Sequence, residues 1–74
     1  MGKLPVLSGR AACAVLARNG FAEVRRRGSH IVMQKVGSGT TTTVVVPDHP
    51  ELRIGTLQSI IRQSGLGRAT FEQK

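Results

Sequence analysis

The chain has 74 residues, and its eleven Lys and Arg against four Asp and Glu give a formal net charge of +7. This length predicts a single domain over residues 1–74 with a thin core, since small domains bury only about 60% of their unfolded surface. The one cysteine, Cys13, excludes an internal disulfide and a thiolate zinc cluster within one chain.

The same features indicate where the protein works. One cysteine fits a reducing compartment, and no apolar run approaches the ~18 residues that span a bilayer. The N-terminal residues do not resemble a secretory signal peptide. We therefore expect a cytoplasmic protein. The basic charge makes nucleic acid, an anionic membrane surface or an acidic protein the candidate partners, and of these we do not expect a membrane.

The first predicted element is a helix that begins after Ser8. The Ser8 hydroxyl can cap its first turn, and Ala12, Val15 and Leu16 have the i, i+3, i+4 spacing of one buried helix face. Gly20 is expected to end the helix, because glycine readily takes the left-handed conformation found at helix ends.

Three strands are predicted next, separated by short turns that contain glycine. Phe21 and Val24 are the expected apolar members of the first strand, and the third strand is β-branched throughout, which favours a strand. The predicted strands span residues 21–27, 30–36 and 40–46, and the turns lie at residues 28–29 and 37–39.

A second helix follows the strands. Thr56 is expected to cap it, and Leu57, Ile60 and Ile61 form its predicted buried face. Gly65 is expected to end it.

The order of helix, three strands and helix predicts an α+β fold. Short connections favour a three-stranded antiparallel sheet in chain order, with both helices on one face and the other face open. This is the layout of the double-stranded-RNA-binding fold.

The turn Gly28-Ser29-His30 directly follows three arginines, Arg25, Arg26 and Arg27. Histidine can give or take a proton near neutral pH, and guanidinium groups bind phosphates. On a strand, Arg25 and Arg27 would share one face and Arg26 would lie on the other. The combination indicates an RNA-cleaving site, although a structural histidine beside a solvated basic strand edge is the alternative.

Three sequence blocks, residues 28–33, 46–50 and 55–66, occur in an order and spacing that resemble the HicA (YcfA-like) toxin family. The resemblance implies a small mRNA interferase with the fold described above, neutralised by a HicB antitoxin. It also implies that His30, the histidine of the Gly-Ser-His turn, is the catalytic residue.

Further residues are candidates for RNA binding or catalysis. We expect Arg25, Arg26, Arg27, Ser29 and Lys35 to bind RNA, although Lys35 lies on the opposite face of a regular strand from His30. His49 is either a general acid that complements His30 or a residue that only fixes its loop. Two histidines are too few for a zinc site without further ligands, so neither a metal nor another cofactor is expected.

The sequence thus predicts a toxin endoribonuclease that cuts mRNA without a metal and is held by a HicB-like antitoxin. The main alternative is a non-catalytic RNA-binding module with the same fold, which would not need a histidine at the turn. A DNA-binding regulator is less favoured, because Arg62 is the one arginine within the second predicted helix.

Overall fold

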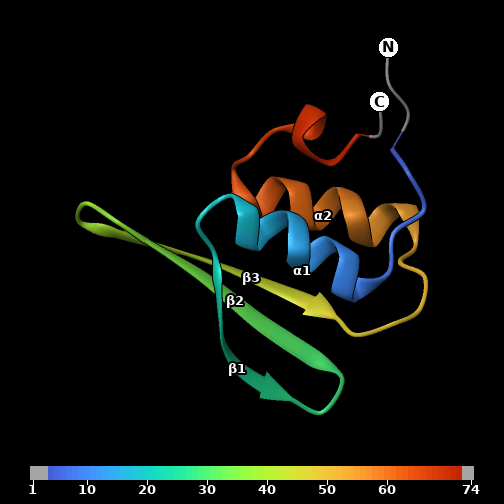
Figure 1. The fold of residues 1–74 in the computed structure, drawn as a ribbon, viewed down its shortest axis with the longest axis horizontal. Helices are drawn as coiled ribbons and strands as arrows, with labels where there is room; N and C mark the ends of the chain where they lie inside the picture. The colour runs from blue at the N-terminus through green and yellow to red at the C-terminus, as the bar shows by residue number, and fades with distance from the viewer. Residues whose placement is uncertain (1–3, 73–74) are drawn as a thin grey trace.

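The computed structural model describes residues 4–72. A helix, α1, is followed by three strands, a second helix, α2, and a short 3₁₀ helix, η1 (Figure 1). The elements are α1 (Gly9–Arg18), β1 (Ala22–Arg27), β2 (His30–Gly37), β3 (Thr40–Pro47), α2 (Ile54–Ser64) and η1 (Arg68–Phe71). The strands form one antiparallel sheet in the order β1-β2-β3, as predicted.

Both helices pack on the same face of the sheet, which confirms the predicted layout. Along β2 and β3, buried residues alternate with more exposed ones, so one face of the sheet carries the core. The core joins side chains of the sheet to side chains of both helices: Ile31, Met33, Val44 and Val46 with Ala12, Leu16, Leu57 and Ile60. No helix among the described residues covers the opposite face.

The ends of α1 follow the prediction. The Ser8 hydroxyl accepts a hydrogen bond from the Ala11 amide at 3.0 Å, which satisfies one of the unpaired donors of the first turn. Asn19 closes the helix, and Gly20 follows with a φ of 94° that favours glycine. The α2 helix also ends as predicted, with Gly65 in the left-handed conformation.

The prediction that Thr56 caps α2 is wrong. The capping residue is Arg53, whose side chain makes no capping hydrogen bond, and the helix begins at Ile54. Leu52 explains the earlier start, because its side chain is buried and its amide donates to the Leu7 carbonyl at 2.8 Å. These contacts fix the loop just before the helix. Of the predicted buried face of α2, Leu57 and Ile60 are buried and Ile61 is only half-buried.

The first strand is shorter and less regular than predicted. Phe21 precedes the strand and is buried, and its amide donates to the Leu16 carbonyl at the end of α1. A register shift between Glu23 and Arg25 leaves Val24 as the extra residue of a β-bulge, and its side chain is 51% exposed. Val24 is therefore not a core residue.

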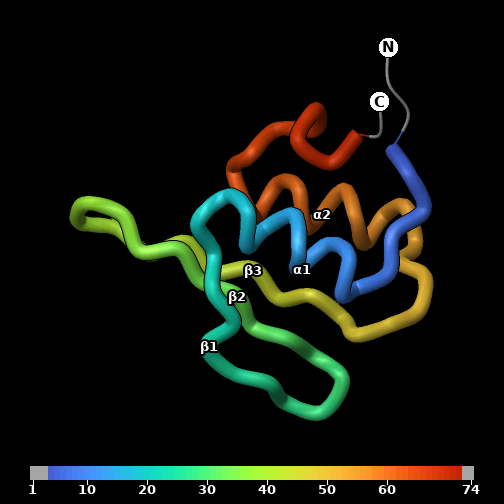
Figure 2. The backbone as a smooth tube through the Cα atoms, in the orientation of Figure 1, coloured from blue at the N-terminus to red at the C-terminus, as the bar shows by residue number. Residues whose placement is uncertain are grey.

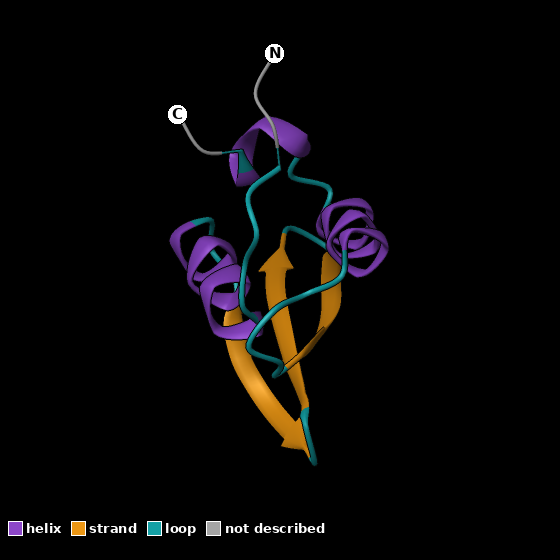
Figure 3. Cartoon of the chain, turned by 90° about the vertical axis from the view of Figure 1, so that its right-hand side faces the viewer, coloured by secondary structure: helices purple, strands orange, loops and turns teal. Residues whose placement is uncertain are grey.

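The sheet extends beyond the helices at one end. Figure 2 shows the tip of the β2–β3 hairpin projecting from the rest of the protein, and Val36 near this tip is exposed. Figure 3 shows η1 at the end of the protein opposite the β1–β2 turn. Within residues 4–72, every helix is too short or too polar to cross a membrane.

Candidate functional site

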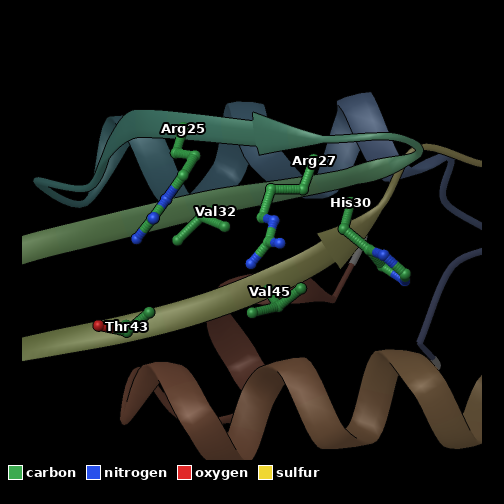
Figure 4. Close-up of a pocket in the computed structure, with 6 residues that line it drawn as sticks. All are labelled: Arg25, Arg27, His30, Val32, Thr43 and Val45. Atoms are coloured by element: carbon green, nitrogen blue, oxygen red, sulfur yellow. The ribbon is translucent and has the colours of Figure 1, made fainter.

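The uncovered face of the sheet carries a shallow groove of about 480 Å³. Side chains of all three strands line it: Arg25, Arg27, His30, Val32, Thr43 and Val45. In Figure 4 the two arginines reach from β1 over β2, Val32 lies between them, and His30 stands at the start of β2. We call this feature the groove.

The strand register explains why these residues share a face. Arg27 is paired with His30 across β1 and β2, and Arg25 is paired with Val32. Val32 is in turn paired with Val45 of β3, so the three strands contribute neighbouring side chains. The predicted common face of Arg25 and Arg27 is confirmed.

His30 owes its position to the two-residue turn before it. Gly28 has a φ of 59°, a conformation that suits glycine and lets β1 and β2 join through two residues. The turn makes His30 the first residue of β2, directly opposite Arg27, and its side chain is exposed to solvent. A proton-transfer group and a cation therefore stand side by side at one end of the groove.

Arg26 points away from the groove. It is paired with Ile31, whose side chain lies on the helix-covered face. Its guanidinium Nη1 donates to Asp48 Oδ2 at 2.9 Å, and Arg10 Nε of α1 lies 3.4 Å from Asp48 Oδ1. The hydrogen bond from Arg26 is the main reason that the pKa of the Asp48 carboxyl lies below its usual range.

The main chain around Asp48 is also held by hydrogen bonds. The Asp48 amide donates to the Ser29 carbonyl at 2.6 Å, and the Gly9 amide donates to the His49 carbonyl at 2.9 Å. A Cβ at Gly9 would overlap the Pro47 carbonyl oxygen, so this close approach requires glycine. We call this region the junction; it comprises Gly9, Arg10, Arg26, Ser29 and residues 47–49.

The junction ties the β1–β2 turn, the end of β3 and the first turn of α1 to one another. It therefore fixes the turn that carries His30 without contributing a side chain to the groove. Ser29, which was predicted to bind RNA, lies at this turn. Its side chain is exposed, and its carbonyl accepts the hydrogen bond from the Asp48 amide.

Two other sequence candidates, and the one cysteine of the chain, lie outside the groove. Lys35 lies on the face of β2 opposite to His30, and its side chain lies beside Gly20. His49 has an exposed side chain and enters the junction through its carbonyl. Cys13 lies on α1, on the far side of the sheet from the groove, and partial burial raises the pKa of its thiol, which disfavours a nucleophilic role.

The groove combines positive charge with an apolar floor. Among residues 4–72, no carboxylate forms an ion pair with Arg25 or Arg27. The same described residues contain no cluster of three or more His, Cys, Asp and Glu side chains that could hold a metal ion. The arrangement can bind a phosphate at the arginines and move a proton at His30.

Four residues that shape this site were not predicted from the sequence. Val32, Thr43 and Val45 line the groove, and Asp48 organises the junction. Strand alternation carried a signal for the first three. It places Val32 on the face opposite to the buried Ile31 and Met33, and it places Thr43 and Val45 on the face opposite to the buried Val44 and Val46. No local pattern indicated that Asp48 would bind Arg26, which is 22 residues away.

Comparison with known proteins identifies the family. The model of the family described as HicA toxin of bacterial toxin-antitoxin matches residues 9–66, a segment that contains both the groove and the junction. No curated protein matches the chain. Since the match covers most of the 74 residues, this chain belongs to the HicA toxin family of bacterial toxin–antitoxin systems.

Proposed function

We propose that this toxin is an endoribonuclease that cuts mRNA in the groove, with His30 as the general acid and base. The observation that carries the proposal is the placement of an exposed histidine beside Arg25 and Arg27 on the uncovered face of the sheet. Each of these groups has a clear part in RNA cleavage.

The chemistry needs little from the protein because the ribose 2′-OH is a nucleophile within the substrate. His30 removes the proton from this hydroxyl, and the oxygen attacks the adjacent phosphorus. The bond from phosphorus to the 5′ oxygen breaks, and the proton held by His30 passes to that leaving oxygen. The products are a 2′,3′-cyclic phosphate and a 5′-hydroxyl.

Arg25 and Arg27 bind the phosphate and stabilise the charge that develops on it during attack. In the strand register Arg27 is nearer to His30 than Arg25 is, because Arg27 is the cross-strand partner of His30. RNA-binding roles for Arg26, Ser29 and Lys35, and a catalytic role for His49, stay predictions. Arg26 is already bound to Asp48, and neither Lys35 nor His49 lines the groove.

The proposed partner that neutralises the toxin is a HicB-like antitoxin with an acidic surface that covers the groove. Exposed arginines and a net charge of +7 would speed capture by an anionic partner. Because mRNA is the proposed substrate, the cytoplasm is the proposed compartment.

Product analysis tests the proposed chemistry. The purified toxin is incubated with RNA, with and without a chelator, and the fragments are analysed by mass spectrometry. We expect 2′,3′-cyclic phosphate ends in both samples, and no cut where the nucleotide before the scissile phosphate is 2′-deoxy. Fragments with 3′-hydroxyl ends, or loss of cleavage in the chelator, would contradict the mechanism.

The alternative of a non-catalytic RNA-binding module also uses the arginines of the groove. It predicts that RNA binds with the same salt dependence but is recovered intact. It further predicts that substitution of His30 changes neither growth inhibition nor RNA integrity.

A further inference from the structure

The floor of the groove is apolar, although its walls are positively charged. Val32 and Val45 are direct cross-strand partners on the uncovered face, and Val45 is 41% exposed. A phosphate site needs the arginines but gains nothing from two valines. The apolar floor therefore indicates a ligand that has an apolar surface as well as a negative charge.

An unpaired RNA nucleotide has this combination. Its base has two apolar faces that pack on side chains, and its phosphate pairs with guanidinium groups. An A-form duplex instead presents phosphates and 2′-hydroxyls, which would leave the valines in contact with polar groups. The floor thus favours single-stranded over double-stranded RNA.

The far wall of the groove offers a polar group to the edge of such a base. Thr43 lines the groove, and its hydroxyl accepts a hydrogen bond from Gln34 Nε2 at 3.2 Å. A hydroxyl that accepts from one partner still has its own proton to donate. The Thr43 hydroxyl can therefore donate this proton to an acceptor on the base.

The distance along the strand fits one nucleotide. Val32 lies two residues after His30 on the same face, which corresponds to about 6.6 Å in a regular strand. A volume of about 480 Å³ is also in the range of sites that hold one small ligand. A base on the floor would belong to a nucleotide adjacent to the phosphate beside His30.

We propose that the groove is a subsite for one unpaired RNA base, which lies on Val32 and Val45 between the two arginines and meets Thr43 at its edge. The base belongs to a nucleotide next to the scissile phosphate. This second statement rests on the proposed function, whereas the base subsite itself does not need cleavage.

The subsite is tested by binding to RNA that cannot be cleaved. A short fluorescently labelled 2′-O-methyl RNA is compared with a hairpin duplex of the same sequence and with strands that carry one abasic residue at successive positions. We expect the duplex to bind about tenfold more weakly than the single strand. One abasic position should weaken binding about fivefold or more, because the strand then buries no base on the two valines.

Truncation of the floor gives a matched comparison. Val45→Ala should weaken binding of the intact strand about threefold or more, but should have no effect on the strand whose critical base is missing. Val36→Ala is the control, because Val36 is an exposed valine of the same sheet that does not line the groove. It should bind both strands as the unsubstituted toxin does, and circular dichroism verifies that both variants fold.

Several results would overturn the subsite. One is binding of the duplex that equals or exceeds that of the single strand, and another is equal affinity for the intact strand and every abasic strand. A third is a loss of affinity in Val45→Ala that is the same for the intact and the abasic strand, and a fourth is the absence of RNA binding at low salt. Failure to cleave all-ribose RNA would contradict the proposed function and leave a measured base subsite intact.

Discussion

The arginine side chains of the groove lack ion-pair partners within the described part of the chain, whereas the charged side chains of the junction are paired with one another. Three consecutive arginines contribute to both regions, Arg25 and Arg27 to the groove and Arg26 to the junction. In the groove, Arg25 and Arg27 have no carboxylate partner among residues 4–72, and His30 is exposed. In the junction, Arg26 is bound to Asp48, and the main-chain amides of Gly9 and Asp48 have carbonyl partners. The side chains of Arg25 and Arg27 lie on one face of β1, and that of Arg26 lies on the other.

This difference separates the residues that stabilise the fold from those that are available for activity. Side chains that make few internal interactions can be replaced with little change in the free energy of unfolding, and they are available to a ligand. Groups that hold three elements together are available only for folding. Substitutions in the groove should therefore change activity, and substitutions in the junction should change stability.

The largest expected effect is that of His30→Ala in the groove. Loss of a general base should lower the cleavage rate about 10²–10⁴-fold. The melting temperature should stay close to that of the unsubstituted toxin, because the side chain is exposed. Cleavage assays and circular dichroism on the same preparation measure both.

His49→Ala is the matched variant in the junction. It keeps the carbonyl that accepts from Gly9, so we expect nearly full activity. A loss similar to that of His30→Ala would make His49 the general acid, and full activity of a folded His30→Ala protein would remove histidine catalysis from the groove.

The next effect is on stability, from Gly9→Ala in the junction. The added methyl group would overlap the Pro47 carbonyl oxygen, so α1 and the end of β3 must separate. We expect a loss of about 1–3 kcal/mol in the free energy of unfolding, measured by urea denaturation.

Gly55→Ala in α2 is the control for Gly9→Ala. A Cβ at Gly55 meets nothing within 4 Å, so this variant should be neutral or more stable by up to about 1 kcal/mol. Equal stability of the two variants would show that the close approach at Gly9 is not a constraint.

A smaller effect divides the arginines themselves. Arg25→Ala and Arg27→Ala should each weaken RNA binding several-fold and reduce the slope of log affinity against log salt by about 0.7–1, because each removes one phosphate contact. Arg26→Ala should leave this slope unchanged, because its guanidinium is held by Asp48. Affinity measured across a salt series compares the three variants, and equal losses for all three would contradict the division.

Local sequence signals were sufficient to predict the fold and part of this division. The β-branched residues of β3, the Ser8 cap and the glycine turns each indicate local structure, and the structure confirms them. The common face of Arg25 and Arg27 follows from the period of two in a strand. These features depend on near neighbours in the sequence.

The features that the sequence did not reveal depend on distant residues. The bulge at Val24 adjusts the pairing of β1 with β2, and no local pattern marks it. The start of α2 is set by Leu52, whose amide binds Leu7 in the N-terminal segment. Likewise, Asp48 acquires its role only when the fold brings Arg10 and Arg26 to it.

The smallest expected effect is that of Asp48→Asn, which weakens the junction without removing its main-chain hydrogen bonds. Exposed ion pairs contribute little, so near pH 7 the melting temperature should fall by a few degrees at most. Because Arg26 lowers the pKa of Asp48 in the folded state, the stabilisation is complete above the unfolded-state value of about 3.9. It is lost as the pH falls through the lower folded-state pKa, since the carboxylate is then protonated.

Melting temperatures of the two proteins should therefore differ by a constant amount from about pH 7 to about pH 5 and converge in stronger acid. A difference that persists after protonation would mean that the carboxylate charge is not its source. Cleavage near pH 7 should stay within about twofold of the unsubstituted toxin, because the Asp48 amide still holds the Ser29 carbonyl. A fall in cleavage as large as that of His30→Ala would show instead that the Asp48 carboxylate positions His30 through the turn, and that the groove and the junction act as one unit.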